Sequence, residues 1–189
     1  MIYKSYDKKW KNFLSESKLR VFDFDDTLVK TDATVKLTRP DGTKEELTPG
    51  EFSQHELDPN NKYDFSDFNK VINPTEVKQV TDILRNVTSA AGRREIIILT
   101  ARDPESQDAI EEWLQGIGID IKKIDVVGLA NPDPMAKANW IENKIVDGAT
   151  DILFLDDSGK NVAAVKALEK EYPGVKIDAR EVKYAENLE

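Results

Sequence analysis

The sequence predicts an α/β protein built on a doubly wound, Rossmann-like parallel sheet of five strands. Apolar runs and helical patterns alternate regularly after residue 73, which is typical of parallel strands joined by crossover helices. Three expected helices open with a capping residue followed by proline, at Asn73, Asp103 and Asp133. The 46 residues of segment 28–73 interrupt this pattern and are too many for an ordinary connection. We therefore expect a single domain, residues 1–189, with a small cap or flap insertion at 28–73, after the first strand.

The expected strands are short apolar segments that end in polar residues or turns. They cover Leu19 to Asp25, Glu95 to Thr100, Ile124 to Gly128, Asp151 to Asp156 and Val175 to Asp178. The expected helices begin at Asn73-Pro74, at Asp103-Pro104, at Asp133-Pro134 and near Ser158, and the last one stops at Pro173-Gly174. In the insertion, residues 34–47 predict a hairpin that turns at Arg39 to Gly42, whereas residues 49–71 predict a polar loop with scattered aromatic side chains.

Composition narrows the classes of function. The chain has 36 acidic and 27 basic side chains, and a net charge of -9 works against non-specific attraction to a nucleic-acid backbone. Cysteine is absent, which suits a reducing cytosol, so we expect a cytoplasmic protein. The first 14 residues carry charge throughout and lack the apolar core of a signal peptide, and the longest aliphatic run is Ile96 to Leu99. We expect no membrane association.

Acidic residues gather where the strands end. In an open α/β sheet the ligand site lies outside the carboxyl ends of the strands, where Asp23 and Asp25 follow the first strand. Two residues apart on extended backbone, they share a face. Asp156 and Asp157 follow the fourth strand. Two carboxylates about 4 Å apart repel by very roughly 4 kcal/mol at an effective dielectric near 20, so the cluster calls for a cation. A ligand set of oxygen atoms alone indicates Mg²⁺.

These residue types suit phosphoryl transfer. A carboxylate such as Asp23 can attack phosphorus and form an aspartyl-phosphate, while Asp25 protonates the leaving oxygen and then activates water. Mg²⁺, Thr100 and the ammonium of Lys137 would ease the approach of one anion to another. Lys144 competes with Lys137, but seven helical residues place it roughly 10 Å farther from the strand ends.

Four motifs in order resemble the haloacid dehalogenase superfamily of phosphatases and phosphotransferases. Asp23-Phe24-Asp25-Asp26-Thr27 is similar to its first motif, "EIIILT" ending at Thr100 to its second, Lys137 to its third, and "DILFLDD" to its fourth. The resemblance implies that Asp23 is the nucleophile and Asp25 the general acid/base. It also implies that Asp23, the backbone carbonyl of Asp25, and Asp156 bind the metal, and it leaves open whether Asp156 or Asp157 is the direct ligand. The insertion at 28–73 occupies one of the two cap positions of that family.

Several residues allow a second interpretation. Arg102 either grips a substrate phosphate or pairs with Asp103 or Glu105. Asp156 or Asp157 can cap the helix that begins near Ser158, and Asn161 can orient a metal ligand from its first turn. Four aromatic residues of the insertion either line a substrate pocket or fill the insertion's own small core. They are Phe52, Tyr63, Phe65 and Phe68.

The predicted function is Mg²⁺-dependent hydrolysis of a small phosphorylated metabolite or nucleotide. One alternative is end processing of a polynucleotide 3′-phosphate, with Lys36, Arg39 and Lys44 as the contacts; the acidic charge balance disfavours it. A second is a phosphoryl-accepting receiver-like signalling domain, which also combines acidic residues, a threonine, a lysine and Mg²⁺. The sequence carries no signal for the oligomeric state.

Overall fold

The computed structural model describes residues 17–183, and a five-stranded parallel sheet forms its centre. The sheet runs in the order β10-β9-β1-β7-β8, with every neighbouring pair parallel. Its strands are β1 (Ser17–Phe22), β7 (Arg94–Thr100), β8 (Ile124–Gly128), β9 (Ala149–Asp156) and β10 (Lys176–Glu181). β1, the first of the described strands, thus lies in the middle of the sheet. The α/β class and the five parallel strands are as the sequence predicts, and the arrangement is compatible with a Rossmann-like fold.

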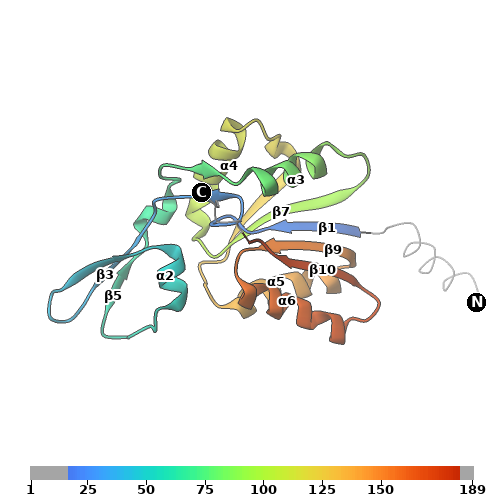
Figure 1. Ribbon diagram of the computed structural model, residues 1–189. Coiled ribbons are helices and arrows are strands. Elements are labelled where there is room, and N and C mark those ends of the chain that lie inside the picture. The colour runs from blue at the N-terminus through green and yellow to red at the C-terminus, as the bar shows by residue number, and fades with distance from the viewer. Residues whose placement is uncertain (1–16, 184–189) are drawn as a thin grey trace, which may run out of the picture.

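Helices cover both faces of this sheet (Figure 1). One layer holds α3 (Lys78–Ser89) and α4 (Gln107–Gly116), and the other holds α5 (Pro134–Val146) and α6 (Gly159–Glu171). Short 3-10 turns precede α4 (η2, Pro104–Ser106) and β8 (η3, Ile121–Lys123). Asp103 caps η2 and Asp133 caps α5 through side-chain oxygens, as the sequence predicts. The cap of α6 is Ser158, whose hydroxyl accepts the Asn161 amide, and not Asp156 or Asp157, the two caps expected from the sequence.

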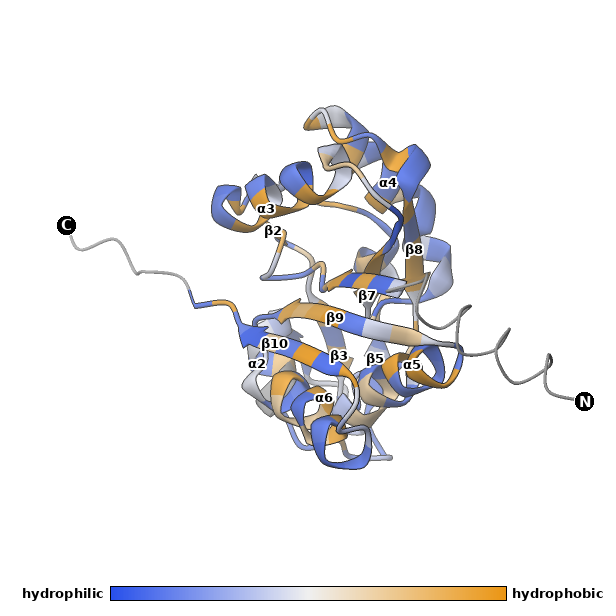
Figure 2. Ribbon diagram, turned by 90° about the vertical axis from the view of Figure 1, so that its right-hand side faces the viewer, coloured by the Kyte–Doolittle hydropathy of each residue, from blue (hydrophilic) through white to orange (hydrophobic). Residues whose placement is uncertain are grey.

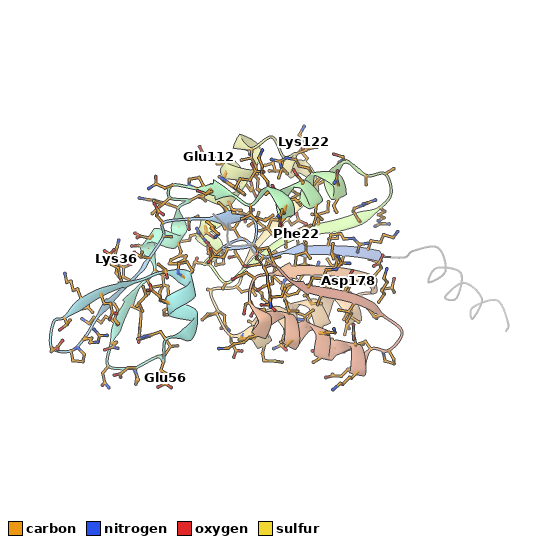
Figure 3. The ribbon with its side chains drawn as sticks, in the orientation of Figure 1. Phe22, Lys36, Glu56, Glu112, Lys122 and Asp178 are labelled. Atoms are coloured by element: carbon orange, nitrogen blue, oxygen red, sulfur yellow. The ribbon has the colours of Figure 1, made fainter. Side chains whose placement is uncertain are left out.

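Two apolar cores lie on opposite faces of the sheet because the side chains of β1 alternate. Leu19 and Val21 belong to the core under α5 and α6, whereas Phe22 belongs to the core under α3 and α4. Figure 2 shows the apolar colouring concentrated on the sheet strands and on the helix faces turned toward them, and Figure 3 shows Phe22 pointing between the layers. The carboxyl end of β1 is therefore fixed between two packed layers.

Between β1 and α3 the chain leaves this sheet and forms a second small structure, here called the insert segment (residues 28–73). Strands β3 (Val35–Thr38), β4 (Lys44–Leu47) and β5 (Lys62–Asp64) make an antiparallel sheet in the order β4-β3-β5, accompanied by α2 (Pro49–Gln54) and the 3-10 turn η1 (Ser66–Asn69). β2 (Val29–Lys30) pairs with β6 (Thr75–Glu76) where the chain leaves and returns. In Figure 1 the insert segment lies beyond the carboxyl end of β1. The expected hairpin is present as β3 and β4.

The insert segment has a small core of its own. Phe52, Tyr63 and Phe68 pack against a buried aliphatic group, whereas Phe65 is 45% exposed at the edge of the same ring cluster. The aliphatic group is Val35, Leu37 and Leu47. Three of the four aromatic residues therefore fill the core of the insert segment, which is one of the two interpretations that the sequence allows.

Two predictions about local structure are wrong. No helix starts at Asn73-Pro74: Asn73 has φ 44°, β6 follows it, and α3 begins only at Lys78, because the returning chain first pairs with β2. Residues 49–71 are also not a plain loop, since they contain α2, β5 and η1. Thr48 and Glu51 form a reciprocal capping box at the start of α2.

In the part of the chain that the structure describes, no helix has both the length and the apolar composition needed to cross a bilayer. The charged segment at residues 1–14, which predicts the absence of a signal peptide, lies outside the described residues.

Candidate functional site

A tight turn after β1 presents the first two aspartates. β1 ends at Phe22, three residues earlier than the sequence predicts, but the amide of Asp23 still donates to the Leu155 carbonyl of β9. The Phe24 carbonyl then accepts the amides of Thr27, Leu28 and Val29, which bends the chain into a single turn. Asp26 takes φ 54° within this turn, a left-handed conformation that aspartate tolerates better than most residues. Asp23 is buried, and the side chain of Asp25 is 18% exposed.

Lys137 joins the first and fourth strand ends. Its Nζ donates to Oδ1 of Asp23 at 2.6 Å and to Oδ2 of Asp156 at 2.7 Å, and all three side chains are buried. Asp133 caps α5 and Pro134 is its first residue, so Lys137 lies in the first turn of this helix. It is directly beside the carboxyl ends of the sheet strands, here called the rim of the sheet. Lys144, the competing lysine, is two turns farther along α5 and pairs with Glu95 instead. The expected preference for Lys137 agrees with this geometry.

Asp156 is fixed by the start of α6. Asn161 Nδ2 donates to both of its carboxylate oxygens, at 2.9 and 3.0 Å, and the Ser158 amide donates to Oδ1 at 2.8 Å. Asn161 thus contacts a candidate metal ligand from the first turn of its helix, as expected. With the bond from Lys137, both oxygens of this fully buried carboxylate are engaged. Such a network holds the group in one orientation.

Thr27 links the first strand end to Asp157, a connection that sequence reasoning misses. Its hydroxyl accepts the Asp157 amide at 2.9 Å and lies 3.4 Å from Oδ2 of Asp23 and from Oδ1 of Asp157. The side chain is completely buried. The sequence signal for a role of Thr27 is its position four residues after Asp23, within the first motif. That signal does not identify its partner Asp157, which is 130 residues away in the chain.

Burial and like charge shift the pKa values of this cluster. Desolvation raises the pKa of Asp23 well above its ordinary value; Lys137 opposes that shift, while Asp156 and Asp157 add to it. Burial, followed by repulsion from Asp156 and Asp26, raises the pKa of Asp157 to about 6. Burial alone would lower the pKa of Lys137, but Asp23 and Asp156 raise it above its ordinary value, so the ammonium stays charged.

Arg102 pairs with the other aspartate of the turn. Its Nε and Nη2 donate to the two carboxylate oxygens of Asp25 at 2.7 and 2.6 Å, a bidentate geometry. Its Nη1 donates to the backbone carbonyls of Phe68 and Lys70, at 2.7 Å each. Neither of the partners expected from the sequence, Asp103 and Glu105, pairs with it among the described residues.

The residues fit a divalent cation at one place. Asp23, Asp156 and Asp157 each offer a carboxylate oxygen, and these three atoms lie within 4.8 Å of one another. Asp23 and Asp156 pair with the single ammonium of Lys137 and Asp157 lies close by, so full ionisation of the three carboxyl groups would leave a formal excess of two negative charges. All-oxygen ligands favour Mg²⁺ over softer metals. The Asp25 side chain is outside this group, so of its atoms only the backbone carbonyl stays a predicted ligand.

Thr100 lies at the carboxyl end of β7, next to β1, and is buried. Its Oγ1 accepts the backbone amide of Arg102 at 3.2 Å. The structure thus joins Asp23, Lys137, Asp156 and Asn161 through hydrogen bonds. It places an oxygen of Asp157 within 4.8 Å of those of Asp23 and Asp156, and it pairs Asp25 with Arg102. Phosphate binding by Thr100, Lys137 and Arg102 stays a prediction.

Comparison of the chain with protein-family models, with curated proteins and with solved structures finds no match. The resemblance to the haloacid dehalogenase superfamily therefore stays a prediction.

Proposed function

We propose that this protein is a Mg²⁺-dependent phosphohydrolase of the haloacid dehalogenase type, which hydrolyses phosphomonoesters through an aspartyl-phosphate on Asp23. One observation carries the proposal: the ammonium of Lys137 lies 2.6 Å from Asp23 and 2.7 Å from Asp156 at the carboxyl ends of parallel strands. An ion pair that served only the fold would need one carboxylate per cation, whereas three carboxyl groups gather here around one ammonium, at the position where α/β sheets bind ligands.

In the first step an oxygen of Asp23 attacks phosphorus, and the bond between phosphorus and the leaving alcohol oxygen breaks. Asp25 gives its proton to that oxygen. Lys137 contacts the attacking carboxylate, so its charge also lies beside the phosphoryl group once that group is attached.

In the second step Asp25 takes a proton from water, and the water oxygen attacks the phosphorus of the aspartyl-phosphate. The bond between Asp23 and phosphorus breaks, which returns a carboxylate and releases inorganic phosphate. Because Asp25 is more exposed than Asp23, it can meet both the leaving group and the water. A receiver-like switch lacks such a group, and this difference favours a hydrolase over a signalling domain.

Asp23, Asp156 and Asp157 would hold the Mg²⁺ ion, together with the backbone carbonyl of Asp25. When bound, the ion supplies charge neutralisation for the substrate phosphate and the carboxylates. Asn161 and Ser158 keep Asp156 oriented toward the cluster, and Thr27 does the same for the loop that carries Asp157. The insert segment, which lies beyond the strand ends, would act as the cap.

The test is release of inorganic phosphate from 4-nitrophenyl phosphate and from a panel of phosphorylated metabolites, with Mg²⁺ or with EDTA. We expect turnover that requires Mg²⁺ and that Asp23→Asn reduces by about 10⁴-fold or more, because the nucleophile is lost. Asp64→Asn, an exposed aspartate of the insert segment, is the control and should keep wild-type activity. Undiminished turnover in Asp23→Asn would refute the assignment of the nucleophile.

Two further measurements separate the proposal from its alternatives. Samples quenched with acid at successive times should contain a phospho-enzyme whose amount falls within seconds once the substrate is used up. A receiver-like domain would retain its phosphate for much longer. A 3′-phosphorylated oligonucleotide should be a poorer substrate than small phosphomonoesters at 0.15 M salt, since the acidic chain repels its backbone. Preference for the oligonucleotide, lost on changing Lys44, would move the substrate class to polynucleotide ends.

A further inference from the structure

Arg102 is the most fully engaged cation at the rim of the sheet. Its three side-chain nitrogens donate four hydrogen bonds, all of 2.6 to 2.7 Å, two to Asp25 and two to backbone carbonyls of the insert segment. Phe24 lies on one side of its guanidinium, 5.0 Å from the ring centroid, and Phe68 lies 5.2 Å away. The side chain is only 1% exposed. A substrate phosphate would have to displace these partners before it could bind the guanidinium.

The backbone around Arg102 is equally constrained. Its amide donates to Thr100 Oγ1, and its carbonyl accepts the amide of Ala130 at 2.9 Å. Gly128 permits this approach, because a Cβ there would lie 2.8 Å from the Arg102 carbonyl oxygen. These contacts hold the loops after β7 and β8 together and fix the position of the guanidinium. The guanidinium connects the carboxylate of Asp25 to two backbone carbonyls of the insert segment.

We propose that Arg102 is a positioning residue for proton transfer, and that it couples the orientation of Asp25 to the docking of the insert segment through the Phe68 and Lys70 carbonyls. This inference rests on the proposed function. Two parallel hydrogen bonds fix the plane of the Asp25 carboxylate, and each oxygen keeps a lone pair that can exchange a proton with the leaving group or with water. The insert segment and Asp25 are thereby connected through the same side chain, that of Arg102. Movement of the insert segment away from the sheet would also change the orientation of the Asp25 carboxylate.

The kinetic test compares Arg102→Lys and Arg102→Gln on substrates that differ in their need for an acid. Glycerol phosphate has a poor leaving group, which must be protonated, whereas 4-nitrophenolate leaves without help. We expect kcat for glycerol phosphate to fall about 100-fold and kcat for 4-nitrophenyl phosphate to fall less than about 5-fold, with KM within about 2-fold for both. A rise in KM and in the inhibition constant of inorganic phosphate, equal for both substrates, would show instead that Arg102 binds phosphate.

A double-mutant comparison isolates the path of the effect. If Arg102 acts through Asp25, then Arg102→Lys changes little once Asp25 is already Asn. An unchanged penalty in the Asp25→Asn background would overturn the proposal. Arg85→Lys is the matched control, because Arg85 also joins a carboxylate, Glu76, to a backbone carbonyl, that of Ile117, but on α3 away from the rim. We expect it to show no dependence on the leaving group.

Hydrogen exchange tests the link to the insert segment without any assay of activity. The amides of Phe68 and Lys70 bond within η1 to the carbonyls of Phe65 and Asp67. In Arg102→Lys these amides should exchange about 10-fold faster, while amides of β7 stay protected. Unchanged exchange would refute the coupling, even if the phosphatase assignment holds. Faster exchange in a protein without phosphatase activity would keep the structural link and refute the proposed function.

Discussion

The rim of the sheet carries two ion-pair groups, each built around one buried cation, and they differ in charge balance. Lys137 faces Asp23 and Asp156 with Asp157 close by, so carboxylates outnumber the cation three to one. Arg102 faces a single carboxylate, and its remaining bonds go to neutral carbonyls. The first group suits a charged ligand, while the second is complete without one. Neighbouring positions on one rim can therefore serve binding and positioning separately.

Lys137→Met should have the largest effect on stability in this comparison. Without the ammonium, Asp23 and Asp156 lose their common buried partner, and breaking such a pair costs about 3–5 kcal/mol. We expect denaturant unfolding in EDTA to show a loss of this size. Saturating Mg²⁺ should recover more stability in the variant than in wild type, because the ion compensates a larger charge excess.

The matched control is Lys144→Met on the same helix. Lys144 pairs with Glu95 where both side chains are partly exposed, at 28% and 37%, and such pairs contribute about 0–1 kcal/mol. Equal losses of stability in the two variants would mean that the carboxylates of the rim cluster need the Lys137 ammonium no more than Glu95 needs Lys144. The proposed difference between the Lys137 and Arg102 groups would then lose its support.

Local signals in the sequence predict most of the fold. The apolar run that ends at Thr100 becomes β7, and the cap-proline pairs at Asp103 and Asp133 precede helical turns. Asn73-Pro74 carries the same local signal, yet pairing of β6 with β2 decides the structure there. Tertiary pairing that closes the insert segment cannot be read from a cap motif alone.

The candidate site shows the same division between local and distant information. Topology alone predicts that Asp23, Lys137 and Asp156 meet, because parallel strands end at one rim. The partner of Arg102 is 77 residues away, whereas Asp103, its neighbour in the chain, caps η2 by accepting the Glu105 amide. The part-buried bond between Thr27 and Asp157 spans 130 residues and has no local signature. Such contacts depend on how loops pack after the sheet has formed.

Titration should distinguish Asp157 from carboxylates outside the cluster. Its pKa is raised to about 6 in the folded protein from an ordinary value of 3.8, so its contribution to stability is present below pH 4 and is lost as the pH rises through about 6. In EDTA, Asp157→Asn should therefore gain stability relative to wild type between pH 4 and pH 6. The stabilisation by Mg²⁺ should grow over the same window, since ligands must be deprotonated.

Asp64→Asn provides the opposite sign. Hydrogen bonds from Ser66 lower the pKa of Asp64, so its contribution is present at neutral pH and is lost as the pH falls. This variant should be less stable than wild type at pH 7, with the difference shrinking toward low pH. If Asp157→Asn follows the same trend as Asp64→Asn, the carboxylate is not under repulsion in the folded state.

Thr27→Val tests whether the two strand ends depend on a hydroxyl. Valine fills similar space but leaves the Asp157 amide without its acceptor, which costs about 1–3 kcal/mol when the group is buried. Thr88→Val is the comparison, because that buried hydroxyl only donates to carbonyls of its own helix. Chemical denaturation should show the larger loss for Thr27→Val. Equal or smaller loss would remove Thr27 from the rim network.

Asn69→Ala should have the smallest effect on stability, and it tests whether Arg102 alone holds the insert segment at this junction. Asn69 Nδ2 donates to Glu105 at 3.3 Å and is a second connection between the insert segment and the core, but it is exposed to water. Water replaces such a bond at little cost, so we expect less than about 0.5 kcal/mol and unchanged hydrogen exchange at Phe68 and Lys70. Exchange as fast as in Arg102→Lys would mean that any contact at this junction holds the insert segment. Unchanged exchange would mean that docking depends on the guanidinium of Arg102, whose side chain is only 1% exposed.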